Sequence, residues 1–219
     1  MNKNGKYYFL EDINYLETSD ESIWGQGDAE TLEIINAYDF SGKWLNLSSG
    51  DGRYNNFILK RAKQVVATDF DLKALKKLEK LTPTDLKAKL TTKQLDLNNV
   101  FPFENLEFDG VFNTGTIHLF PVEFVERVFG EIDRVLKVGG KIFIDFACEI
   151  KRVTKEGKVM NDERKNYGLA EVKSIFEKCF PNYDLKFDLG EVKPEWVGEQ
   201  EKPHFFSCKF WIVRGVKNS

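Results

Sequence analysis

The stretch WLNLSSGDGRY, from Trp44 to Tyr54, decides the fold of this chain. It begins as a short apolar strand, WLNL, then turns through Gly50 and Gly52 and continues with apolar residues at helical spacing. A strand, a glycine turn and a helix form a nucleotide-binding corner, because bare glycine backbone lets a ligand approach and the helix N-terminus offers free N–H groups. An ordinary turn between a strand and a helix fits the same pattern, since Ser48 stands where a further glycine is expected.

The composition is that of a water-soluble globular protein. The chain has 219 residues, of which 42 % are apolar and 31 % charged, so we expect one domain over residues 1–219 with a full core. A net charge of −3 argues against nucleic acid as the main partner. Cys148, Cys179 and Cys208 are far apart, with neither metal-ligand spacing nor a disulfide framework, and we therefore expect no metal site.

The chain shows no sign of a membrane or secretory segment. No apolar run approaches the roughly 20 residues of a membrane span. The N-terminal sequence MNKNGKYYFLED is polar and lacks the apolar centre of a signal peptide. We therefore expect a cytoplasmic protein with no membrane partner, and the sequence leaves its oligomeric state open.

Strand patterns alternate with helix patterns along most of the chain. The predicted strands cover residues 44–47, 65–68, 92–95, 108–117, 141–147, 184–189 and 205–214, and the predicted helices cover 28–42, 53–62, 72–81, 121–138 and 169–180. This alternation predicts an α/β fold with three layers and a doubly wound, mostly parallel sheet. The last two strands follow one another without a helix, so they are predicted to form an antiparallel hairpin at one edge.

Several segments are interpreted from their composition. Gly139 and Gly140 are predicted to end the long helix. The charged, unperiodic residues 148–167 are predicted to form a loop or insertion on the substrate side, and residues 192–204 a polar loop. Residues 1–27 are interpreted as a lid or cap. Five lysines that lie among leucines at helical spacing are predicted to form a solvated helix face rather than a binding patch; they are Lys63, Lys73, Lys76, Lys77 and Lys80.

Polar residues end the predicted strands at one edge of the sheet, where such folds bind ligands. Asp69 ends the second strand and can accept both hydrogen bonds of a ribose diol, although it also fits the N-cap of the next helix. Asp96 ends the third strand and can accept the exocyclic amine of a base. Asn113 to Gly115 ends the fourth strand.

Taken in order and spacing, five pieces of this sequence resemble the class I S-adenosylmethionine-dependent methyltransferases. They are LNLSSGDG, VVATDFD, LDLNNVFPF, FDGVFNTGTIHLF and RVLKVGGKIFI, and together they cover about residues 28–147. The resemblance implies a seven-stranded sheet whose last strand is antiparallel, which agrees with the edge hairpin. It also implies S-adenosylmethionine as the cofactor.

The same resemblance assigns roles to the first two strand ends. Gly50 and Gly52 are expected to line the methionine part of the cofactor. Asp69 is expected to hold the ribose hydroxyls, and Phe70 is expected to pack on the adenine.

The third and fourth strand ends complete the expected cofactor site. By the resemblance, Asp96 and Leu97 contact the edge of the adenine. Asn113 and Thr114 then line the floor beneath the sulfonium.

Two positions of the expected cofactor site depart from the family pattern. Asn46 stands where an acidic residue is usual in the first strand, and Ser48 stands where the first glycine is usual. Asn46 can still form hydrogen bonds but supplies no charge for the ammonium group. These two residues support the alternative of a non-catalytic, methyltransferase-like binding protein.

The acceptor is expected to enter over loops that carry Trp24 and His118. A neutral His118 can accept a proton from the acceptor, or it can simply fill the wall beside Phe120. Together with Tyr7 and Tyr8, Trp24 either folds over the cofactor as a lid or packs on the sheet.

The sequence favours a methyltransferase acting on a small-molecule acceptor. The cofactor carries the activated methyl group, so the protein chiefly has to orient the reactants, and the lack of a catalytic triad is no objection. A chain of this length leaves no room for an added substrate domain, which favours a small acceptor. Another nucleotide-binding enzyme, such as a dehydrogenase, is a further alternative, weakened by Ser48 and by the edge hairpin.

Overall fold

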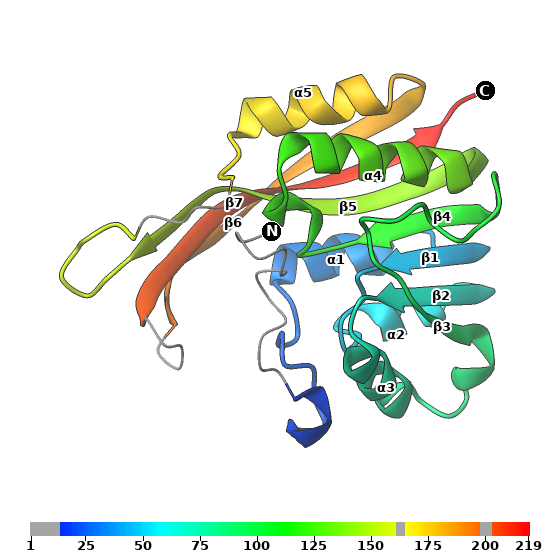
Figure 1. The fold of residues 1–219 in the computed structure, drawn as a ribbon, viewed down its shortest axis with the longest axis horizontal. Helices are drawn as coiled ribbons and strands as arrows, with labels where there is room; N and C mark the ends of the chain where they lie inside the picture. The colour runs from blue at the N-terminus through cyan, green and yellow to red at the C-terminus, as the bar shows by residue number, and fades with distance from the viewer. Residues whose placement is uncertain (1–13, 161–164, 198–202) are drawn as a thin grey trace.

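A seven-stranded sheet forms the centre of the protein in the computed structural model, which describes residues 14–160, 165–197 and 203–219 (Figure 1). The strand order is β3-β2-β1-β4-β5-β7-β6. The strands are β1 Lys43–Leu47, β2 Gln64–Asp69, β3 Leu90–Gln94, β4 Phe108–Asn113, β5 Leu136–Val153, β6 Tyr183–Val197 and β7 His204–Lys217.

The sheet is parallel over its first five strands and antiparallel at one edge. β1 pairs with β2 and β4, β2 with β3, and β4 with β5, all in parallel. β7 runs antiparallel to both β5 and β6. The predicted fold class, a mostly parallel seven-stranded sheet with an antiparallel edge hairpin, is therefore confirmed.

Helices cover both faces of the sheet, giving three layers (Figure 1). The helices are α1 Ala29–Ala37, α2 Asn55–Leu59, α3 Leu72–Leu81, α4 Val122–Val135 and α5 Leu169–Cys179, with short 3-10 helices η1 Tyr15–Glu17, η2 Lys87–Lys89 and η3 Ile117–Leu119. On one face, α4 and α5 bury Phe129 and Phe176 against β4 and β5. On the other face, α1 and α2 bury Ile35 and Ile58 beside Phe112 and Phe143.

The N-terminus of α1 is capped as predicted. The carboxylate of Asp28 accepts a hydrogen bond from the backbone N–H of Thr31 over 2.8 Å, which satisfies one of the free donors at the helix start. The helix after the glycine turn is shorter than predicted, because α2 covers only Asn55–Leu59.

The strands β5, β6 and β7 are longer than predicted, and together they extend past the rest of the sheet as an arm (Figure 1). Residues 148–153 belong to β5, and Cys148 and residues 151–153 pair with β7, so the expectation of a loop over 148–167 is wrong for these six residues. The expectation of a polar loop over 192–204 is wrong for 192–197, which belong to β6. β7 pairs with a strand on each side, and this pairing satisfies backbone hydrogen-bonding groups of the extended residues. The pairing explains the extension, and the polar composition of these residues does not predict it.

Gly139 and Gly140 do not end the long helix. The helix α4 ends at Val135, and Leu136 is already extended and begins β5. The register between β4 and β5 shifts over these glycines, from Leu136 opposite Phe108 to Lys141 opposite Gly110. The glycine pair therefore forms an irregularity in a strand, with Gly139 at a φ of 75°.

None of the helices in the described part of the chain combines the length and apolar character needed to cross a membrane.

Candidate functional site

The glycine turn after β1 has left-handed backbone at three of its five positions. The φ angles are 51° at Ser48, 54° at Gly50 and 95° at Gly52. At Gly52 a Cβ atom would lie 2.9 Å from Cγ of Leu78 in α3, so glycine is required both for the turn and for the packing of that helix. Ser48 holds its angle at a cost, because left-handed backbone disfavours any residue with a Cβ.

Asp69, at the end of β2, is joined directly to this turn. Its Oδ2 accepts a hydrogen bond from the backbone N–H of Gly50 over 2.9 Å, and its Oδ1 accepts one from Asp71 over 2.9 Å. Burial raises the pKa of Asp69, and these two hydrogen bonds oppose the rise. Asp71, rather than Asp69, caps α3 by accepting from the N–H of Lys73, so Asp69 is not the cap of that helix.

The residues predicted to contact the adenine lie at the ends of β2 and β3. Phe70 is 43 % exposed and follows Asp69 directly. The backbone N–H of Leu95 donates to the carbonyl of Asp69 over 2.9 Å, which brings the two strand ends together. Asp96 accepts a hydrogen bond from the N–H of its near neighbour Asn98, and Leu97 is buried.

The end of β4 joins the site from the other side of β1. Asn113 is fully buried, and its Nδ2 donates to the carbonyl of Leu47 over 2.8 Å. Thr114 follows it and is partly exposed. The structure therefore brings the predicted strand-end residues to one edge of the sheet, around the glycine turn.

Asn46 is buried in β1, and its amide is already used. Its Nδ2 donates to Oδ1 of Asn55, at the start of α2, over 3.1 Å. This contact ties the strand to the helix that follows the glycine turn. Asn46 thus stands in place of the usual acidic residue, and the side-chain amide of Asn55 is its hydrogen-bond partner.

Trp24 lies beside the glycine turn. A Cβ on Gly50 would be 3.1 Å from the indole Nε1 of Trp24, and the guanidinium of Arg53 donates to the carbonyl of Trp24. The tryptophan is partly exposed and forms a wall next to the expected methionine position. Tyr7 and Tyr8 lie outside the described residues.

Sequence reasoning missed a buried carboxylate inside the glycine turn. Asp51 accepts hydrogen bonds from Oγ of Ser22 and from the N–H of Ile23, and it pairs with Lys77 of α3 at 3.1 Å. The prediction that Lys77 belongs to a solvated helix face is therefore wrong, since its side chain is buried. The sequence signal was the acidic residue between two glycines, although a charge at that place also fits an exposed turn.

His118 lies in η3, directly after the turn that follows β4. It is largely buried, and its ring is edge-on to Phe146, with 6.1 Å between ring centroids. Phe146 belongs to the core beneath α4 and α5. His118 therefore lies beside the carboxyl ends of the parallel strands, on the face of the sheet that α4 and α5 cover.

A second carboxylate that the sequence analysis did not select lies at this edge. Asp145 of β5 accepts a hydrogen bond from the backbone N–H of Gly115 over 2.7 Å. Burial raises the pKa of Asp145 to about 7. The signal in the sequence is one aspartate within the apolar run KIFIDFA.

The strand-end residues fit the cofactor that the resemblance implies. Three buried polar atoms in or beside the glycine turn have no hydrogen-bond partner among the described residues: Oγ of Ser49, Nδ2 of Asn55 and Oδ1 of Asn113. Each carboxylate oxygen of Asp69 makes one hydrogen bond and retains capacity for another, as a ribose diol requires. Bound S-adenosylmethionine would supply an electrophilic methyl group on a sulfonium.

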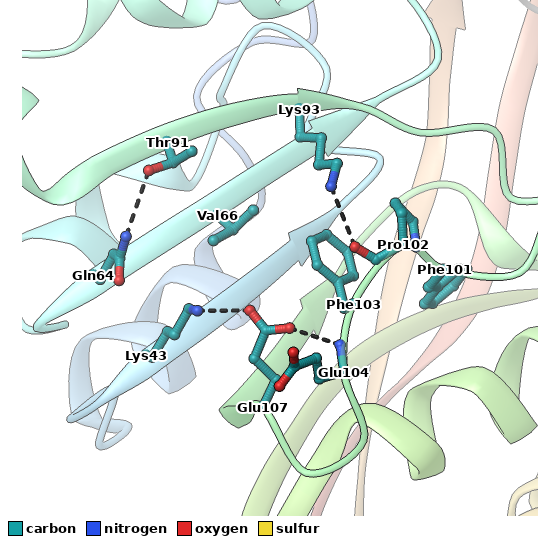
Figure 2. A pocket seen from close by; sticks show the side chains of 10 residues that line it. All are labelled: Lys43, Gln64, Val66, Thr91, Lys93, Phe101, Pro102, Phe103, Glu104 and Glu107. Carbon is teal, nitrogen blue, oxygen red and sulfur yellow. Dashed lines mark hydrogen bonds and ion pairs between the residues drawn. The ribbon is translucent and has the colours of Figure 1, made fainter.

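A cleft of about 480 Å³ lies elsewhere, around the amino ends of β1 and β2 (Figure 2). Its two lysines are partnered: Nζ of Lys43 lies 2.7 Å from Glu107, and Nζ of Lys93 donates to the carbonyl of Pro102. None of the residues that line the cleft belongs to the glycine turn. In the described residues, no group of three or more His, Cys, Asp and Glu side chains is placed to hold a metal ion.

Comparison with known proteins gives one matching family model and one clear relative. A model described as a methyltransferase domain matches residues 45–144. Phosphoethanolamine N-methyltransferase 1 of wheat, Triticum aestivum, is 33 % identical over 178 residues, which are 79 % of this chain. The match covers 34 % of the wheat protein, so the chain spans about a third of that relative's length.

Solved structures share the fold at low sequence identity. The YcgJ protein from Bacillus subtilis has a TM-score of 0.64 and 12 % identity, covering 87 % of this chain and 97 % of its own. An S-adenosylmethionine-dependent methyltransferase from Mesorhizobium loti has a TM-score of 0.61 and 12 % identity, covering 88 % and 100 %. The complex of DhpI with S-adenosylhomocysteine has a TM-score of 0.59 and 16 % identity, covering 85 % and 82 %.

Proposed function

This chain belongs to the class I S-adenosylmethionine-dependent methyltransferases, and we propose that it transfers the methyl group to a small-molecule acceptor. The observation that carries the proposal is the hydrogen bond between the N–H of Gly50 and Asp69. It holds the glycine turn and the end of β2 in one arrangement, with oxygen atoms of Asp69 available to a ribose diol.

A small acceptor is supported by one relative and by the chain itself. The wheat protein is named for phosphoethanolamine, a small molecule. The described residues place Trp24 beside Gly50 and place β5 next to β4, so acceptor contacts can come from the same chain that holds the cofactor.

We assign the cofactor-binding roles to the residues at the strand ends. Gly50, Gly52 and Asp69 would hold the methionine and ribose parts. Asn46 and Ser48 would lie beside the methionine part. Phe70, Asp96 and Leu97 would contact the adenine, and Asn113 and Thr114 would line the floor below the sulfonium. On the acceptor side, Trp24 would form a wall and His118 would accept a proton where the acceptor carries one.

The decisive experiment is calorimetry with S-adenosylmethionine, S-adenosylhomocysteine and a nicotinamide dinucleotide. The proposal predicts binding of the first two ligands and none of the third. Binding of both adenosyl ligands, without detectable methyl transfer to any of a panel of small amines, alcohols and thiols, would indicate a non-catalytic binding protein. Failure of both adenosyl ligands to bind would contradict the proposal outright.

A further inference from the structure

Asp145 is a charged residue within an otherwise apolar part of β5. Its neighbours Ile144 and Phe146 face the core beneath α4 and α5, so the alternation of a strand turns Asp145 towards the opposite face, that of α1 and α2. Ile144 pairs with Asn113, the last residue of β4. Asp145 therefore lies just beyond the carboxyl end of β4, at the edge that carries the expected cofactor site.

The turn after β4 holds this carboxylate in place. The N–H of Gly115, two residues after Asn113, donates to Oδ1 of Asp145 over 2.7 Å. No other described residue donates a hydrogen bond to the carboxylate of Asp145, so Oδ2 keeps its full capacity within the described part of the chain. The residue thus borders the site on the side of β5, away from the adenine end at β2 and β3.

Of the charges that act on Asp145, only that of Arg53 is positive. Among the described residues, no lysine, arginine or histidine forms an ion pair with it. Burial and the nearby carboxylate of Asp28 both raise its pKa, to about 7, while Arg53 lowers it. Tyr54 and Cys208, the other titratable groups that sense this carboxylate, are neutral at ordinary pH and supply no positive charge.

We propose that Asp145 is a specificity-determining residue that binds the methyl acceptor, and that this acceptor is a cationic amine. An ammonium group provides a paired positive charge, and a charge-assisted hydrogen bond to Oδ2 would fix its position next to the turn at Gly115. Before its nitrogen takes the methyl group it has to give up one proton, to His118 or to solvent, and S-adenosylhomocysteine is the leaving group. A neutral alcohol or thiol of the same size would leave the carboxylate uncompensated. This inference rests on the proposed function, because it places the acceptor beside the same strand-end site.

The test uses propylammonium as the probe and propan-1-ol as its neutral analogue. Each is titrated into the cofactor-free protein and into protein saturated with S-adenosylhomocysteine, and the carboxyl ¹³C signal of Asp145 is followed by NMR. Propylammonium is expected to lower the pKa of Asp145 by about one unit, equivalent to tenfold tighter binding to the ionised form. Propan-1-ol is expected to leave that pKa unchanged.

Variants separate this role from a structural one. Asp145→Asn keeps an oxygen for the N–H of Gly115 and is expected to bind propylammonium about tenfold more weakly, whereas Asp145→Glu retains part of the affinity. Asp184→Asn, which makes the same change at an exposed site on β6, should bind like wild type. All variants are first checked for native circular dichroism.

Two results would overturn the inference. One is propylammonium binding that is equal in wild type and Asp145→Asn; the other is a wild-type pKa that propylammonium does not move. Failure of S-adenosylhomocysteine to bind would instead contradict the proposed function. The titration of cofactor-free protein would still report on Asp145 in that case, so the two failures are distinguishable.

Discussion

Nζ of Lys77 lies 3.1 Å from Oδ2 of Asp51 in an ion pair whose side chains are 3 % and 0 % exposed. Asp51 belongs to the glycine turn and Lys77 to α3, so the pair joins the expected cofactor loop to the helix after β2. Ser22 and Ile23 donate to the same carboxylate, over 2.7 and 2.8 Å. One buried aspartate therefore holds together the segment before α1, the turn and a helix.

Breaking this pair should destabilise the protein strongly. Lys77→Met leaves Asp51 as a buried and unpaired charge, and we expect the free energy of unfolding to fall by about 3–5 kcal/mol in urea denaturation. Adding Asp51→Asn should recover part of the loss. Lys76→Met, on the exposed side of the same helix, is the matched control and should change stability little. Equal stability of the two single variants would show that the buried pair is not what holds the turn.

Asp69 should contribute to cofactor binding through its charge. Asp69→Asn removes charge-assisted hydrogen bonds to the ribose, each worth roughly 1.5–3 kcal/mol, so calorimetry should show at least a tenfold loss of affinity. Asp71→Asn preserves the cap of α3 and serves as the neighbouring control. Unchanged affinity in Asp69→Asn would remove the ribose role.

Asp69→Ala should behave differently from Asp69→Asn. It deletes both acceptors for the N–H groups of Gly50 and Asp71, whereas asparagine keeps one oxygen. Two backbone donors then lose their partners, and the cofactor-free protein should be less stable by about 1–3 kcal/mol. Thermal unfolding without ligand measures this difference.

Ser48→Gly should stabilise the protein. Ser48 has a φ of 51°, and relieving left-handed backbone at a residue with a Cβ is worth about 1 kcal/mol, partly offset by the greater freedom of glycine in the unfolded chain. Cofactor affinity should stay similar or improve. Ser49→Gly is the control, because Ser49 has no positive φ and should gain nothing. Urea denaturation measures the stability of both variants, and a Ser48→Gly protein that is less stable than wild type would contradict this expectation.

His118→Gln tests whether this histidine accepts a proton. If the acceptor must lose one, turnover should fall about a hundredfold while cofactor affinity stays nearly unchanged, and the acidic limb of the pH–rate profile should disappear. The chain has one other histidine, and His204→Gln should leave that limb in place. Ordinary turnover with an unchanged profile would assign His118 to packing against Phe146.

The raised pKa of Asp145 should also appear in the pH dependence of stability. The unfolded chain binds a proton at Asp145 with an ordinary pKa near 4, and the folded chain with a pKa of about 7. The folded state therefore holds more protons between these values, so this group's contribution to stability falls as pH rises from about 4 to about 7 and is constant above. Wild type should lose stability over this range relative to Asp145→Asn. Parallel curves from urea denaturation at several pH values would contradict the shift.

The sequence by itself determined the sheet and the edge at which the expected site lies. Apolar runs at β1, β2, β4 and β5 and the glycine turn after β1 are local patterns, and local patterns report which residues are extended, helical or turned. Because parallel strands align their carboxyl ends, the order of strands and helices also brought Asp69, Asp96 and Asn113 to one edge.

The tertiary structure alone decided which charges are buried and how far the edge strands run. Lys77 lies on a helix face that is solvated unless another segment covers it, and Ser22 and Thr18 lie on that covering segment. The polar residues of the arm become strands because β7 pairs with two neighbours at once. Asp145 acquires its environment from α1, the turn at Gly115 and β7, all distant in sequence. Burial and pairing of this kind depend on long-range contacts, which the local sequence pattern does not contain.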